Sequence, residues 1–163
     1  TLSGMNKEEF ITLIKGEQAQ LRRFLLALCC GNADDADDIA QESLVKAYLS
    51  CEGYKDSGRL TSWIYKIAYN TFLDRHKSRV SHQSLECAYE FADNSLSADD
   101  AFRYQELYNA LKQIPPKERS AILLYYISGY SIREISKITE ASEDAVKKQL
   151  SRGREHLKEL LKL

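Results

Sequence analysis

Proline and glycine are scarce in this sequence. Its 163 residues include only two prolines and seven glycines, whereas leucine, isoleucine, alanine, lysine and glutamate are frequent. Few residues would therefore break a helix, and such a composition is typical of helical proteins. The length suits one ordinary domain or two small ones. We predict an all-α protein.

Long apolar runs and a secretion signal are also missing. No stretch approaches the length needed to span a bilayer, and no signal peptide is visible, so we expect a cytoplasmic protein without direct membrane insertion. The four cysteines form no Cys-x-x-Cys pair, and no histidine lies at ligand spacing from them; they are Cys29, Cys30, Cys51 and Cys87. They are best interpreted as free thiols of a reducing compartment rather than as a metal or disulfide framework.

Motifs that signal catalysis are absent too. The sequence has no Gly-x-Gly-x-x-Gly, no phosphate-binding loop and no nucleophile elbow. The aspartates of residues 34–38 do not have the spacing of a calcium loop, and the three histidines are scattered. We therefore expect no enzymatic activity, no metal and no cofactor.

The charge is unevenly distributed along the chain. Residues 1–77 carry ten Lys and Arg against eleven Asp and Glu (net −1), residues 78–100 carry one against five (net −4), and residues 101–163 carry twelve against eight (net +4). The overall net charge of −1 hides this division. A basic C-terminal end beside an acidic middle indicates more than one kind of partner.

Apolar spacing and breakers predict where the helices lie. One helix runs from residue 6 or 7 to 29, the next starts among the aspartates and passes Tyr48, and a third runs from 60 to about 77. The region that follows lacks apolar residues at helical spacing. After it, helices are expected at 98–114 and 117–128, separated by Pro115 and Pro116. Residues 79–97 predict a flexible linker between two helical domains, residues 5–78 and 98–163.

The stretch from Tyr126 to Leu160 predicts a helix-turn-helix. Its buried positions are Ile135, Ala141 and Val146, and Ser142 is placed to cap the second helix. That helix carries four basic and no acidic residues between 145 and 154. Glu140 occupies a turn position usually given to glycine, so it must adopt positive φ at a cost of about 1 kcal/mol unless the turn bends differently. A charged helix face is often simply exposed to solvent and binds nothing. The motif alone therefore does not distinguish a DNA-binding helix from a solvated one.

Two sets of segments together resemble a known family. IPPKERSAILLYYISGYSIREISKITEASEDAVKKQLSRGREHLKELL is similar to region 4 of bacterial RNA polymerase sigma factors of the extracytoplasmic-function class, and DDIAQESLVKAY and RLTSWIYKIAYNTFLDRHK are similar to region 2. They occur in the expected order and cover nearly the whole chain. The resemblance implies a sigma factor that binds core RNA polymerase and promoter DNA, recognises −10 and −35 elements and promotes promoter melting. It also implies an anti-sigma factor as a partner.

The resemblance assigns residues to three tasks. For docking on polymerase it implies Asp38, Gln41, Glu42, Leu44 and Val45. The same pattern would also occur in a helix whose acidic first turn is only solvated and whose apolar residues belong to the core. For the −10 element it implies Asn70, which can bond a flipped-out base, with Tyr54, Ser57, Leu60, Tyr65 and Lys66 around it. For the −35 element it implies Lys147, Lys148, Gln149, Ser151, Arg152 and Arg154, of which Arg154 is expected to bond phosphate.

One other function fits the same residues. A helix-turn-helix transcriptional regulator could use the basic helix in the same way without being a polymerase subunit, its N-terminal domain sensing a ligand or forming a dimer. Affinity for polymerase distinguishes the two hypotheses.

Overall fold

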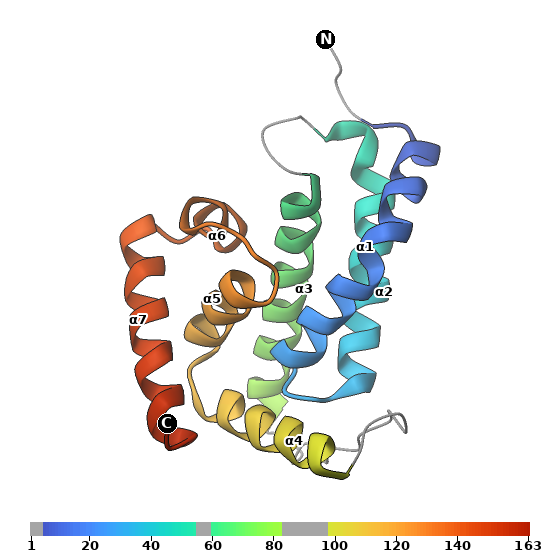
Figure 1. The fold of residues 1–163 in the computed structure, drawn as a ribbon. Helices are drawn as coiled ribbons and strands as arrows, with labels where there is room; N and C mark the ends of the chain where they lie inside the picture. The colour runs from blue at the N-terminus through green and yellow to red at the C-terminus, as the bar shows by residue number, and fades with distance from the viewer. Residues whose placement is uncertain (1–4, 55–59, 83–97) are drawn as a thin grey trace.

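The computed structural model describes residues 5–54, 60–82 and 98–163, without the side chains of residues 60, 78–82 and 98–103. Within these ranges all regular structure is helical, as predicted (Figure 1). The elements are α1 (Lys7–Leu28), α2 (Ala33–Ser50), the short 3-10 helix η1 (Cys51–Gly53), α3 (Leu60–His82), α4 (Ala98–Gln113), α5 (Pro116–Tyr126), α6 (Ile132–Thr139) and α7 (Glu143–Leu160).

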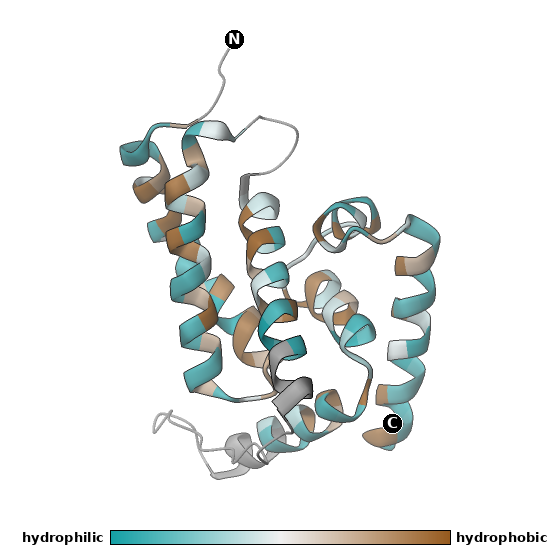
Figure 2. Cartoon of the chain, turned by 180° about the vertical axis from the view of Figure 1, so that it is seen from behind, coloured by the Kyte–Doolittle hydropathy of each residue, from teal (hydrophilic) through white to brown (hydrophobic). Residues whose placement is uncertain are grey.

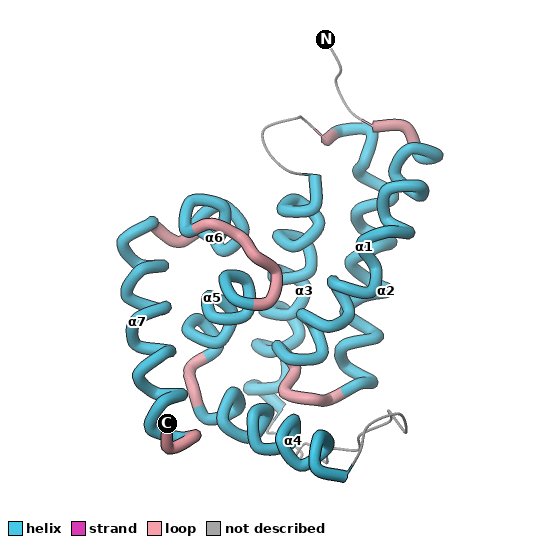
Figure 3. Tube along the Cα trace, in the orientation of Figure 1, coloured by secondary structure: helices cyan, strands magenta, loops and turns pink. Residues whose placement is uncertain are grey.

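The N-terminal half consists of α1, α2 and α3, which pack side by side (Figure 3). Asn6 caps α1, since its side chain accepts a hydrogen bond from the Glu9 backbone N–H. The helix ends where Cys30 and Gly31 take positive φ (55° and 89°), and Asn32 then caps α2 in the same way as Asn6 caps α1. A side-chain oxygen at each cap satisfies one of the helix's unpaired N–H groups. This tight connection brings α2 back along α1.

Helix α3 is longer than predicted. It continues to His82, five residues beyond the expected end near Lys77, and so takes up the first four residues of the predicted linker. Apolar residues no longer recur at helical spacing beyond Lys77. The segment that follows, SRVSH, nevertheless contains no proline or glycine to end the helix. The rest of the predicted linker, residues 83–97, lies outside the described residues.

The C-terminal half consists of α4 to α7. Pro116 is the first residue of α5, a position where its missing N–H costs no hydrogen bond. Helix α5 is buried along most of its length and lies against α7. The two approach closely at Gly153, where an added Cβ would come within 2.8 Å of Ile122 Cγ1.

The two halves share one hydrophobic core. Helix α1 packs against α5, and α3 packs against α6. The buried residues on both sides form a continuous cluster, and brown, apolar positions lie mainly where helices face one another (Figure 2). The prediction of two small helical units is confirmed, and in this structure the two units are packed against each other.

Candidate nucleic-acid interface

The turn between α6 and α7 is built by short-range hydrogen bonds. Ser131 and Glu134 form a reciprocal capping box at the start of α6. Ser142 caps α7 by accepting from the Ala145 N–H at 3.1 Å, as predicted. Between them Glu140 has φ 59° and ψ 25°, so the expected positive φ is confirmed. The Ser136 hydroxyl donates to the Ala141 carbonyl and ties α6 to the turn.

Glu140 allows a test of backbone strain. Replacing it by glycine should raise the free energy of unfolding by about 0.5 kcal/mol, because left-handed backbone costs other residues about 1–2 kcal/mol and glycine's unfolded-state entropy offsets part of that gain. Urea denaturation measures the change. The matched variant Glu140→Ala keeps the strain and loses the side chain, so equal stabilisation by alanine would contradict this account.

Apolar contacts hold the two helices at a fixed angle. Ile135 and Val146 are fully buried, as predicted, and Leu150 is buried beside them. The third predicted position, Ala141, is only half-buried but packs against the same core.

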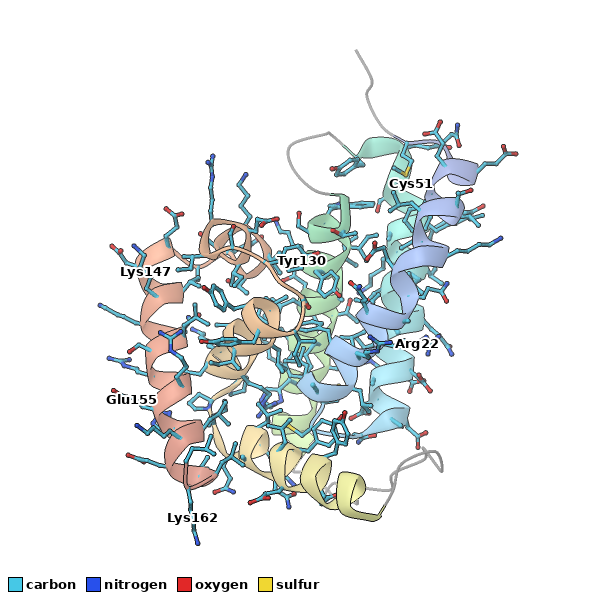
Figure 4. All side chains as sticks on the ribbon, viewed as in Figure 1. Arg22, Cys51, Tyr130, Lys147, Glu155 and Lys162 are labelled. Carbon is cyan, nitrogen blue, oxygen red and sulfur yellow. The ribbon has the colours of Figure 1, made fainter. Side chains whose placement is uncertain are left out.

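The outward side of α7 presents most of the predicted −35 residues. Lys147, Lys148, Ser151 and Arg152 are exposed, and Lys147 points away from the body of the molecule (Figure 4). Gln149 is half-buried. Arg154 is exposed as well, and it donates a hydrogen bond to the Tyr126 hydroxyl at 3.1 Å. Five of the six predicted residues therefore lie at the surface of α7.

Of the predicted −10 residues, Asn70 is exposed on α3, whereas Tyr65 is only 2 % exposed. The Tyr65 ring packs edge-on against Tyr130, with centroids 5.2 Å apart, and also against Phe24. Burial raises the pKa of the Tyr65 phenol, an effect that the neighbouring Ser128 opposes. Lys66 forms an ion pair with Glu140, its Nζ lying 3.1 Å from Oε1. This side of α3 thus faces α6 and the turn in the described arrangement.

The remaining −10 residues precede or begin α3. Tyr54 is half-buried and packs on Trp63, with ring centroids 5.1 Å apart. Ser57 lies outside the described residues. Leu60 is the first residue of α3, but its side chain is not described. Trp63 itself is partly buried and packs against the core.

Most of the residues predicted to dock on polymerase lie at the surface of α2. Asp38, Gln41, Glu42 and Val45 are exposed, whereas Leu44 is half-buried against the core. Leu49, four residues after Val45, was not predicted although its helical spacing from Val45 could have indicated it. The exposed fractions of Val45 and Leu49 are 57 % and 70 %.

Arg75 of α3 neutralises part of this face. Its guanidinium lies 3.6 Å from Asp38 Oδ2 and 3.4 Å from Glu42 Oε2. Lys46 adds a second partner for Glu42 at 3.4 Å. The exposed edge of α2 therefore combines paired acids with apolar side chains, which we call the α2 face (Asp38, Gln41, Glu42, Val45 and Leu49).

Among the described residues, no group of three or more His, Cys, Asp or Glu side chains is placed to hold a metal ion. None of the helices in these ranges has the length and hydropathy of a membrane span.

Two family models match this chain. Sigma-70 region 2 matches residues 13–81, which cover most of α1 and all of α2 and nearly all of α3. Sigma-70 region 4 matches residues 104–157, which include the helix-turn-helix.

Curated relatives agree with both models. The chain is 30 % identical over 146 residues to the ECF RNA polymerase sigma factor SigW of Bacillus subtilis, covering 81 % of this chain and 78 % of the relative. It is 29 % identical over 154 residues to the ECF RNA polymerase sigma factor SigM of Mycobacterium tuberculosis, covering 93 % and 76 %.

Solved structures share the fold along most of the chain. The sigma factor RpoE in complex with the anti-sigma factor NepR, from Bartonella quintana, matches with a TM-score of 0.83 and 25 % identity, covering 96 % of this chain and 98 % of that chain. CnrH in complex with the cytosolic domain of CnrY matches with a TM-score of 0.74 at 20 % identity, covering 96 % and 90 %, which is a likeness of fold.

Proposed function

The chain belongs to the sigma-70 family of RNA polymerase sigma factors, in the extracytoplasmic-function class, and we propose that it binds core RNA polymerase and directs it to promoters with particular −10 and −35 elements. One observation carries the proposal: region 2 and region 4 both match, in order, within one chain. A regulator independent of polymerase would need only the helix-turn-helix. The α2 face has no role in that alternative, whereas a subunit that docks on polymerase requires such a surface.

The proposed division of labour follows the two halves. Residues 5–78 would bind polymerase and the −10 element, residues 98–163 would bind the −35 element, and residues 79–97 would connect them. The exposed Lys147, Lys148, Ser151 and Arg152 suit a DNA groove, since such side chains bond phosphates and base edges. Binding through phosphates should weaken steeply as salt rises.

An anti-sigma factor is the further partner that we propose. Of the two solved structures described above, RpoE is bound to the anti-sigma factor NepR, and CnrH is bound to the cytosolic domain of CnrY. We place the protein in the cytoplasm, where the polymerase works. Catalysis of RNA synthesis would belong to the polymerase alone.

Run-off transcription tests the proposal directly. Core polymerase reconstituted with this chain should start transcripts from defined positions on genomic DNA fragments, whereas core polymerase alone should not. Sequencing those transcripts would give the promoter elements. A dimer that binds a palindrome and has no affinity for polymerase would refute the proposal in favour of the regulator.

The α2 face gives a sharper prediction. Changing Val45 and Leu49 together to aspartate should weaken the complex with core polymerase about a hundredfold or more, because two apolar side chains that would be buried there become charged. Both are exposed, so the fold should be retained. Leu163→Asp is the matched control, since Leu163 is 82 % exposed and distant in sequence. Equal affinity of the double variant and the control, measured by co-purification or fluorescence anisotropy, would exclude this surface.

A further inference from the structure

A hydrogen bond between Tyr126 and Arg154 joins the end of α5 to α7. The Arg154 Nη1 donates to the Tyr126 hydroxyl at 3.1 Å, and the two helices pack against each other (Figure 1). Both side chains nevertheless lie at the surface, since Tyr126 is 56 % exposed and Arg154 is also exposed. The bonded pair is therefore accessible to a further ligand.

The bond leaves hydrogen-bond donors on both side chains. A guanidinium carries five N–H donors, and this contact uses one of them. A phenol oxygen that accepts a hydrogen bond still has its own O–H to donate. Because the Tyr126 oxygen accepts from a cation, its O–H is polarised and becomes a stronger donor. The pair thus offers a positive charge and a neutral donor at one place, which is the combination that an anion binds.

The pair also lies on a basic flank of α7. Lys147, Ser151, Arg154 and Lys158 follow one another at spacings of four, three and four residues, so they share one side of the helix. All four are exposed, and three of them are positively charged. Since Arg154 reaches Tyr126, this is the flank beside α5. A helix that enters a DNA groove has the sugar-phosphate backbone along its flanks, so a phosphate is the anion that this flank would meet.

We propose that Tyr126 is a further DNA-contacting residue, and that its hydroxyl and the Arg154 guanidinium together bind one phosphate of the promoter duplex. We call this pair the phosphate clamp (Tyr126 and Arg154). Arg154 supplies the charge, and the phenol O–H supplies a second hydrogen bond to the same phosphate. The bond between the side chains also holds the guanidinium in place before DNA binds, so less side-chain freedom is lost. This inference rests on the proposed function, because it adds a contact to the proposed −35 interface.

Non-specific duplex DNA tests the clamp without a promoter or polymerase, because phosphate contacts do not depend on sequence. Fluorescence anisotropy of a labelled duplex of mixed sequence, titrated with the full chain, gives the affinity at several salt concentrations. Tyr126→Phe should weaken binding about fivefold, since it removes one hydrogen bond to a phosphate. The salt dependence should stay the same, because no charge is lost. A variant that merely displaced α7 would lose several phosphate contacts and part of the salt dependence with them.

Tyr125→Phe is the matched control. Tyr125 directly precedes Tyr126 in α5 and is 38 % exposed, and the two rings pack edge to face with centroids 4.9 Å apart. The control keeps this ring contact and removes only a hydroxyl, so its DNA affinity should equal that of the unaltered chain. Equal affinities of Tyr126→Phe and Tyr125→Phe would overturn the proposal.

A double-mutant cycle tests whether both groups hold the same phosphate. Arg154→Gln should weaken binding and reduce the slope of log affinity against log salt by about 0.9, the value for one phosphate contact. In that background Tyr126→Phe should change the affinity by less than about twofold, because the phosphate is no longer held beside the hydroxyl. The same loss from Tyr126→Phe in both backgrounds would contradict the clamp.

Failure of the clamp can be told apart from failure of the proposed function. If Arg154→Gln weakened binding and Tyr126→Phe did not, the clamp would be wrong while the −35 assignment of α7 would stand. If the unaltered chain had no affinity for duplex DNA at low salt, the clamp and the −35 assignment would both be wrong.

Discussion

Replacing Arg119 by alanine should lower the free energy of unfolding by about 3–5 kcal/mol, because three buried backbone carbonyls lose their charged hydrogen-bond donor at a cost of about 1–3 kcal/mol each. Arg119 is only 7 % exposed. Its Nε donates to the Leu111 carbonyl at 2.8 Å, its Nη1 to that of Leu28 at 3.0 Å and its Nη2 to that of Ile114 at 3.3 Å. Leu28 ends α1, Leu111 lies in the last turn of α4 and Ile114 directly follows that helix, and the last carbonyls of a helix have no partner within it.

The expected loss is a large part of the stability of an ordinary domain, which is about 5–15 kcal/mol. Urea denaturation measures it. Arg119→Lys should be intermediate, because an ammonium cannot reproduce the planar arrangement of guanidinium donors. Arg133→Ala, at an exposed position of α6, is the control and should change stability by no more than about 0.5 kcal/mol. If Arg119→Ala were as mild as this control, Arg119 would not join the two halves.

Replacing Asn70 by alanine should reduce open promoter complexes about tenfold or more, as expected from losing a bidentate contact to a base edge. Asn70 is exposed in the middle of α3, where alanine is a better helix former, so stability should not fall. Binding of the C-terminal half to duplex −35 DNA should be unchanged. Permanganate reactivity of the melted bases, with reconstituted polymerase, measures opening.

The matched control for this experiment is Asn109→Ala. Asn109 is an exposed asparagine of α4, away from the proposed DNA surfaces. It should leave promoter opening at the level of the unaltered chain. Normal opening by Asn70→Ala would show that another residue holds the displaced base.

The packing of the two halves bears on how the −10 residues could act. Tyr65 contacts Tyr130 and Lys66 pairs with Glu140, so the C-terminal half covers this side of α3 in the described arrangement. Asn70 is exposed in the same arrangement. If Tyr65 and Lys66 also contact the displaced strand, as proposed, the halves must first separate, whereas Asn70 requires no such movement.

Local features of the fold were predictable because they depend on neighbouring residues. Ser142 as a cap, Glu140 at positive φ and the two prolines at the start of α5 each act through the next few residues of the chain. The predicted end of α3 was too early, because a helix can continue after its apolar residues cease to recur at helical spacing.

Contacts between distant residues could not be predicted in the same way. Tyr65 meets Tyr130, and Arg119 reaches the carbonyl of Leu28, across long separations in sequence. The family resemblance had placed Tyr65 beside the −10 element, and nothing in the sequence singled out Arg119. The apolar stripes of the helices show that each has an inner side, but not which helix of the other half will cover it.

The absence of a side chain at Gly153 controls how the basic helix is presented. Even one methyl group at this position would clash with Ile122, so α7 can pack closely against α5 only if residue 153 is glycine. A larger residue would change the angle between α7 and α5. The exposed residues of α7 would then shift relative to the base pairs of a bound promoter. Promoter preference could in this way change through a position that never touches DNA.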